Sequence, residues 1–160
     1  MQTNHKRLLV AAQGYSELGL PDLGLAELNL LPGELQRDPV VVETRLSVLM
    51  GARRYKEALP IAQELCRLVP EKSTGFIHTA FCMHELGDSQ SARDILAGGP
   101  NSLKSDATYY YNLACYETAL GNFDEARANL DVSFAMDKKL RDYAMNDPDL
   151  EALRPCGVVC

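Results

Sequence analysis

A repetition with a period of 34 residues is the feature that most constrains this chain. The segments LGLPDLGLAEL, ARRYKEALPIA, LGDSQSARDIL and LGNFDEARANL align without an insertion. The 34-residue spacing separates their turn residues, which are Gly19, Arg53, Gly87 and Gly121. It also separates Gly24, Ala58, Ala92 and Ala126, and likewise Pro21, Tyr55, Ser89 and Phe123. Agreement at several positions without an insertion indicates that the chain is built from repeated units.

Each copy of the repeat predicts two antiparallel helices. Large apolar residues recur at one place in the first segment, namely at Leu8, Val42, Phe76 and Tyr110. Small or medium apolar residues follow four places later, at Ala12, Leu46, Ala80 and Ala114. This spacing puts both series on one face of a helix. A small residue at the Gly24 place of the second helix lets the two helices approach closely, and a bulky side chain there would cost about 1–3 kcal/mol.

Composition excludes several classes of function. The chain has 160 residues, of which 46% are hydrophobic and 24% charged, as expected for one soluble globular domain. Lys and Arg number 16 against 22 Asp and Glu, and this acidic balance argues against a nucleic-acid partner. The one cluster of basic residues is Arg53, Arg54 and Lys56, and it is interpreted as a solvated turn.

Segments that would direct the chain to a membrane are not found. The apolar run LLVAA is too short for a secretory signal, and no window approaches the roughly 18 to 20 apolar residues of a spanning helix. We therefore expect no integral membrane span and a cytoplasmic location. In the terminal CGVVC, the lipidated position of a prenylation motif would be Gly157, one place off register. Peripheral tethering through Cys156 or Cys160 stays an alternative to a flexible tail over 154–160.

The pattern of reactive residues predicts neither an enzyme nor a cofactor. The chain has five cysteines, an odd number without a CxxC pair, and Cys66, Cys82 and Cys115 fall in apolar runs as small buried hydrophobes. His78 and Cys82 are four residues apart on one predicted helix, but two ligands do not make a zinc site. No phosphate-binding loop, paired-carboxylate motif or cofactor fingerprint is present. We expect no catalytic residues, no metal and no cofactor.

These features resemble the tetratricopeptide repeat, whose pattern joins a 34-residue period, a glycine and an aromatic residue at the turn, an alanine three residues later and an exit proline. The segment YNLACYETALGNFDEA, residues 111–126, is the best copy, and Pro70 supplies an exit proline. The copies depart from the pattern in having no tryptophan, and by Arg53 and Gly24 in place of the usual glycine and alanine. The resemblance covers about residues 5–138.

The resemblance implies an all-α fold, a right-handed superhelical array of antiparallel helix pairs. The repeats would span about residues 5–38, 39–72, 73–106 and 107–138, in a single domain over 1–153. The third copy breaks at AGGP, residues 97–100, so its second helix should be short. Capping helices are expected over 139–153, with Leu140, Tyr143 and Ala144 facing inward. Asp147 should cap a terminal helix that begins at Pro148.

In a tetratricopeptide array the first helices line a concave groove, and this predicts the partner-binding positions. They are Leu9, Gln13, Glu43, Thr44, Ser47, Ile77, His78, Phe81, His84, Tyr111, Asn112 and Cys115. Exposed apolar surface rimmed by polar groups is typical of a protein contact. The alternative is that neighbouring repeats or the N-terminal segment of the chain cover Ile77, Phe81 and Tyr111.

The function that the resemblance implies is a non-enzymatic adaptor that holds a peptide segment or a filament subunit of another protein. The size of the chain, its NLACYETALG segment and its DPDLEAL tail are similar to those of short bacterial tetratricopeptide proteins. Among these are the bacterial kinesin light chains, accessory and stabilising factors of bacterial tubulin filaments. The alternatives are a secretion or assembly chaperone that shields an apolar client segment, and self-association through repeat edges.

Overall fold

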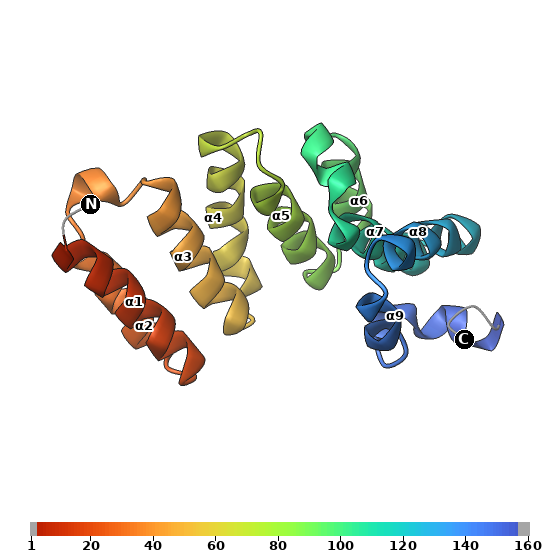
Figure 1. Cartoon of the computed structure of the whole chain (residues 1–160), viewed down its shortest axis with the longest axis horizontal. Helices are drawn as coiled ribbons and strands as arrows, with labels where there is room; N and C mark the ends of the chain where they lie inside the picture. Colours follow the sequence, from red (N-terminus) through yellow and green to blue (C-terminus); the bar gives the residue numbers. More distant parts are fainter. Residues whose placement is uncertain (1–2, 157–160) are drawn as a thin grey trace. The chain divides into compact units, whose positions relative to one another are not determined.

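The chain folds into helices arranged in two compact units. A computed structural model describes residues 3–156, and the contacts divide the chain into Met1–Pro70 and Glu71–Cys160. The described residues form α-helices and short 3-10 helices without a β-strand, which confirms the all-α fold class. Figure 1 labels the α-helices of both units.

The N-terminal unit consists of two helix pairs. It contains α1 (Thr3–Glu17), α2 (Pro21–Asn29), the 3-10 helix η1 (Gly33–Leu35), α3 (Pro39–Gly51) and α4 (Tyr55–Leu68). Within the pairs α1 packs on α2 and α3 on α4, and α3 also contacts both helices of the first pair. One cluster of its core is made of Leu8, Ala12, Leu28, Leu31 and Val41.

The C-terminal unit adds a terminal extension to two further helix pairs. The pairs are α5 (Ser73–Glu85) with α6 (Ser89–Ala97), and α7 (Ala107–Ala119) with α8 (Phe123–Met136). The 3-10 helix η2 (Asn101–Ser105) separates them, and α9 (Lys139–Ala144) and the 3-10 helix η3 (Pro148–Cys156) follow. Helix α6 ends at Ala97, so the short helix expected before AGGP is confirmed. The extension contacts the last pair, α9 on α8 and η3 on α7.

The turn inside each helix pair has the same backbone geometry. The φ angles are 73° at Gly19, 55° at Arg53, 93° at Gly87 and 81° at Gly121. The backbone N–H of the residue after each of these donates to the carbonyl five residues earlier, over 2.8 to 2.9 Å; Leu20, for example, donates to Tyr15. This is the Schellman arrangement that ends a helix with a left-handed residue. Arg53 therefore adopts the left-handed conformation that glycine adopts in the other three turns.

The small residues of the second helices are buried against their partners. Ala58, Ala92 and Ala126 are fully buried, as the expected close approach requires. At Gly24 the two helices come still closer, because an added Cβ atom would lie 2.8 Å from the carbonyl oxygen of Ala12. Glycine in place of the usual alanine thus matches a tighter contact between α1 and α2.

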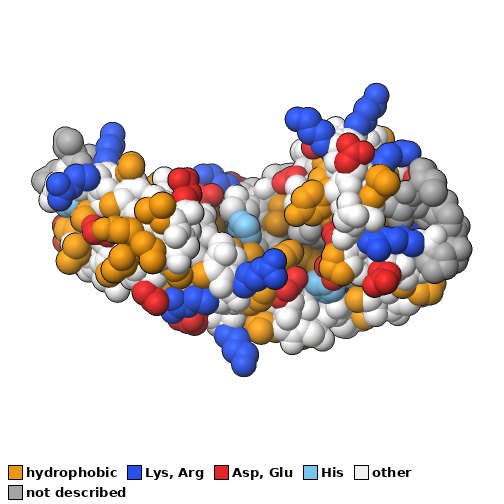
Figure 2. Space-filling view, turned by 90° about the horizontal axis from the view of Figure 1, so that it is seen from below, with side chains coloured by type: hydrophobic (Ala, Val, Ile, Leu, Met, Phe, Trp, Pro, Cys, Tyr) orange, Lys and Arg blue, Asp and Glu red, His pale blue; other side chains and the backbone are white. Residues whose placement is uncertain are grey.

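The basic turn at residues 53–56 is partly neutralised within the N-terminal unit. The Arg54 guanidinium lies 2.6 Å from Asp22 and 2.7 Å from Glu57. Acidic and basic side chains are interspersed over the face that Figure 2 shows. Arg53 and Lys56 are exposed, which agrees with the interpretation of this run as a solvated turn.

The terminal extension differs from expectation in part. Ala144 is fully buried, but Tyr143, which was expected to face inward, is 71% exposed. Asp147 caps the last helix as predicted, because its Oδ1 accepts a 3.0 Å hydrogen bond from the backbone N–H of Asp149. That helix is of the 3-10 type and includes residues 154–156 of the expected tail. Cys160 and the other residues of 157–160 lie outside the described residues.

Candidate functional site

In the N-terminal unit, the predicted partner-binding positions lie on α1 and α3. Leu9 is half-buried, whereas Gln13, Glu43 and Ser47 are exposed. Thr44 was expected to be exposed, but only 6% of its surface is accessible. Its hydroxyl donates a 2.7 Å hydrogen bond to the backbone carbonyl four residues earlier in α3, which holds the side chain against the helix.

In the C-terminal unit, the predicted positions differ between the two first helices. Half-buried side chains on α5 are Ile77, His78, Phe81 and His84. The positions on α7 are more covered, with exposed fractions of 6% at Tyr111, 8% at Asn112 and 4% at Cys115. The exposure expected on α7 is therefore wrong. Within this unit α7 packs against its neighbours α5 and α6 and against η3, a C-terminal segment that was not considered as a cover.

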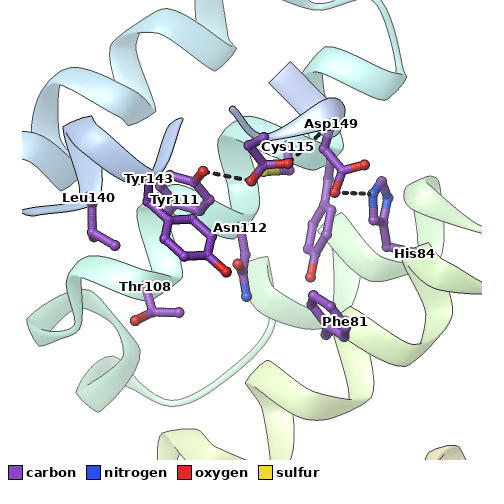
Figure 3. A pocket seen from close by; sticks show the side chains of 11 residues that line it. Phe81, His84, Thr108, Tyr111, Asn112, Cys115, Leu140, Tyr143 and Asp149 are labelled. Carbon is purple, nitrogen blue, oxygen red and sulfur yellow. Dashed lines mark hydrogen bonds and ion pairs between the residues drawn. The ribbon is translucent and has the colours of Figure 1, made fainter. Parts of the chain in front are cut away.

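A cavity remains beside η3 in the C-terminal unit. Its volume is about 210 Å³, and α5, α7, α9 and the start of η3 contribute to its wall. Figure 3 shows the side chains that line it. Among them are the predicted site residues Phe81, His84, Tyr111, Asn112 and Cys115. The fold thus brings these residues together, whereas Ile77 and His78 on α5 do not line the cavity.

Two acidic residues attach the C-terminal segment to the helices that it covers. The Tyr111 hydroxyl on α7 donates a 2.6 Å hydrogen bond to Oδ2 of Asp147. Nε2 of His84 on α5 lies 3.2 Å from Oδ2 of Asp149. Leu150 and Leu153 are fully buried at the same place. These polar contacts, dashed in Figure 3, act together with the burial of the two leucines to hold η3 on the first helices.

Asp147 and Asp149 are cavity residues that sequence reasoning did not identify. Asp147 was predicted only as a helix cap, and Asp149 had no assigned role. The one signal in the sequence is a pair of acidic residues on either side of Pro148. That signal does not reveal which helices the segment contacts, because the contact to Tyr111 joins residues 36 positions apart.

Burial keeps the cavity's thiol and phenol groups in their neutral forms. Burial raises the pKa of Cys115 far above its usual range, and the charges of Asp147 and Asp149 raise it further. Burial, followed by the hydrogen bond to Asp147, raises the pKa of Tyr111 in the same direction. The hydrogen bond from His84 instead holds the pKa of Asp149 below its ordinary value. A protonated thiol is a poor nucleophile, so Cys115 is suited to packing and not to covalent chemistry.

Cys82 and groups of metal-ligating side chains are the other candidates for reactive chemistry. Cys82 is buried, and burial together with the charge of Glu85 raises the pKa of its thiol to about 11. Within residues 3–156, no group of three or more His, Cys, Asp or Glu side chains is placed to hold a metal ion. In that same range, no helix combines the length and the apolar character needed to cross a membrane.

Comparison with known proteins relates the chain to solved structures by fold. No protein-family profile matches the chain, and no curated protein sequence matches it. Two structures of MamA, "MamA 41-end from Desulfovibrio magneticus RS-1" and "MamA RS-1 ArsTM double mutant", each superpose with a TM-score of 0.76 at 16% identity, covering 99% of this chain and 94% of theirs. A third, "MamA MSR-1 C2", has a TM-score of 0.69 at 15% identity, covering 82% of this chain and 76% of its own. The chain therefore has a fold of the tetratricopeptide type, as MamA does.

Proposed function

We propose that the chain is a non-enzymatic adaptor that binds a segment of a partner protein on the first-helix face of its C-terminal unit. The observation that carries this proposal is the cavity of about 210 Å³ between α5, α7 and the C-terminal extension. Pockets that combine aromatic walls with a few polar groups are typical binding sites.

The way in which the chain covers its own helix α7 supports the same proposal. The segment from Asp147 to Leu153 binds there through one hydrogen bond from Tyr111, one contact with His84 and two buried leucines. A partner segment beside it would use the same kinds of interaction. Phe81 is then an expected anchor, since it is half-buried and lines the cavity.

The partner to test first is a bacterial tubulin filament, as the resemblance to bacterial kinesin light chains implies. In this proposal the adaptor acts in the cytoplasm, which agrees with an odd number of cysteines without a CxxC pair. Binding along the polymer would stabilise the filament or attach it to another structure.

Co-sedimentation of the full chain with assembled bacterial tubulin tests the filament as partner. A peptide library displayed on phage tests segment binding independently of that choice. Peptides enriched on the wild-type chain should bind Phe81→Ala more weakly by about 2 kcal/mol or more, because truncation of an aromatic anchor removes a hot spot. The matched control is Asp131→Ala, an exposed position on α8 away from the cavity, which should bind normally.

The outcomes separate the alternatives. Co-sedimentation that Phe81→Ala abolishes and Asp131→Ala preserves supports the filament adaptor. Enriched peptides without filament binding keep the adaptor proposal and remove tubulin as its partner. Binding only to an unfolded client, and not to its folded form, supports the chaperone alternative instead. The absence of both filament binding and enriched peptides would contradict the adaptor proposal.

A further inference from the structure

Aromatic rings from three elements form much of the cavity wall. They are Phe81 on α5, Tyr111 and Tyr116 on α7, and Tyr143 on α9. The Tyr111 and Tyr143 rings meet edge to face, with centroids 6.4 Å apart at an angle of 76°. Cages of several aromatic rings around one space recognise ammonium groups.

The charged groups of the wall are acidic. Asp147 and Asp149 line the cavity together with His84, and none of the described lining residues is a lysine or an arginine. The two carboxylate oxygens of Asp147 accept from the Asp149 N–H and the Tyr111 hydroxyl, which are neutral donors. Arg154 donates instead to the backbone carbonyl of Asp147, over 2.6 Å. Among the ion pairs of residues 3–156, none joins Asp147 or Asp149 to a lysine or arginine.

A buried hydroxyl in the wall has no hydrogen-bond partner within residues 3–156. Tyr116 is 1% exposed, and its hydroxyl has no hydrogen-bond partner among the described residues. Such a group ordinarily finds a partner, and each exception needs a reason. A phenolic oxygen accepts a hydrogen bond from an ammonium or guanidinium N–H.

The negative charges of Asp147 and Asp149 affect the titration of other groups that line the cavity. After burial, the charges of Asp147 and Asp149 are the next causes that raise the pKa of Cys115. For Tyr116 the cause after burial is Cys115, and the charge of Asp149 follows. Burial is the main reason that both groups are disfavoured as anions, and the nearby negative charge adds to it; that charge would attract a bound cation.

We propose that the cavity binds the cationic side chain, a lysine or an arginine, of the partner segment. This inference rests on the proposed function and specifies the chemistry of its ligand. The cavity of about 210 Å³ exceeds the volume of several waters at about 30 Å³ each, so an alkyl stem with its charged head fits. A purely apolar side chain would take water from the two carboxylates without bringing a positive charge, and an acidic one would be repelled.

Small probes test this charge preference directly. The full chain is titrated with n-butylammonium, n-butanol and butyrate while its amide NMR spectrum is recorded. The expected result is saturable shifts at residues around Tyr111, Tyr143 and Asp149 with n-butylammonium, and binding of n-butanol that is weaker by about fivefold. A short glycine and serine peptide with one central lysine should bind at least as well as n-butylammonium. If only the free amine binds, a side chain of a partner segment is not the ligand.

Substitutions of Tyr143 place the binding in the cavity and avoid loss of the fold, because this side chain is 71% exposed. Tyr143→Phe keeps the ring and should bind n-butylammonium normally, whereas Tyr143→Leu should bind it more weakly by about threefold. Asp149→Asn should weaken the cation more than it weakens n-butanol. Equal binding of the two Tyr143 variants would show that the ring does not contact the cation.

Failure of this inference differs from failure of the adaptor proposal. Equal affinity for n-butylammonium and n-butanol, preference for butyrate, or no binding of any probe would overturn the cation site. In each case, peptides that depend on Phe81 would still support an adaptor with a different ligand preference. Enriched phage peptides that contain lysine or arginine and compete with n-butylammonium would support both.

Discussion

The hydroxyl of Tyr111 donates a 2.6 Å hydrogen bond to Oδ2 of Asp147, which lies 36 residues further along the chain. The bond connects α7 to the segment that leads into η3, and Tyr111 itself is 6% exposed. The covering of the last first-helix face therefore depends on side-chain contacts between distant parts of the sequence.

Removal of this hydroxyl should lower the stability of the chain. We expect Tyr111→Phe to reduce the free energy of unfolding by about 2 kcal/mol, because a hydrogen bond to a charged group is lost and the carboxylate keeps its burial. Urea denaturation measures the change. Tyr143→Phe is the matched control, since this exposed tyrosine should tolerate the loss within about 0.5 kcal/mol. Equal effects of the two substitutions would contradict the role of the Tyr111 bond.

The contact between His84 and Asp149 predicts a dependence of stability on acid. The pKa of Asp149 in the folded chain lies below its ordinary value of 3.8, chiefly because of the hydrogen bond from His84. A carboxyl with a depressed folded pKa contributes stability that is present above its unfolded pKa and lost as pH falls through the folded one. The contribution is therefore complete at neutral pH, begins to fall near the unfolded pKa of about 4, and is lost below the folded pKa.

Comparison with Asp149→Asn isolates this contribution from general acid denaturation. Urea unfolding of both proteins, measured from pH 7 down to pH 3, should show the wild type more stable at neutral pH. The difference between the two should shrink as the pH falls below about 4. A difference that stays constant over the whole range would exclude titration of Asp149 as its source.

The close contact at Gly24 predicts that alanine at this position destabilises the chain, although alanine has the higher helix propensity. Gly24→Ala should reduce the free energy of unfolding by about 1–3 kcal/mol, because the added Cβ meets the backbone oxygen of Ala12. Gly14→Ala in α1 is the matched control, as an added Cβ there has no neighbour within 4 Å. That change should stabilise the chain by about 0.5–1 kcal/mol. Thermal and urea unfolding of both variants would test the pair, and stabilisation by Gly24→Ala would disprove the close approach.

The strained turn at Arg53 predicts a stabilising substitution. Arg53 has a φ of 55°, where the other three turns have glycine. Arg53→Gly should raise the free energy of unfolding by about 0.5–1 kcal/mol, since relief of the left-handed conformation exceeds the added entropy of the unfolded chain. Ala52→Gly, at a φ of −84°, lacks such strain and should destabilise. The idea fails if both substitutions lower the urea midpoint.

The sequence alone predicted the helices and their turns, because those depend on neighbouring residues. Apolar residues four places apart define the buried face of a helix wherever they occur. A glycine every 34 residues marks a turn that requires positive φ, and Arg53 could be placed there by register. The small residues at Ala58, Ala92 and Ala126 likewise predicted the contact between paired helices.

The accessibility of the candidate site followed less well from the sequence. Phe81, His84, Tyr111, Asn112 and Cys115 were predicted on first-helix faces, and the cavity contains all of them. Their role in partner binding remains a prediction. The periodic pattern treats each first-helix face alike, so it could not distinguish the exposed Ser47 on α3 from the buried Cys115 on α7.

What only the tertiary structure decided is the position of the C-terminal segment. The contacts from Asp147 to Tyr111 and from Asp149 to His84 join residues that no local pattern relates. Helix periodicity determines which side of each helix is apolar, and it does so from neighbouring residues alone. Which segment packs on that side depends on contacts between residues tens of positions apart, whose formation closes a loop of the chain. A local sequence pattern does not show which distant segment makes those contacts.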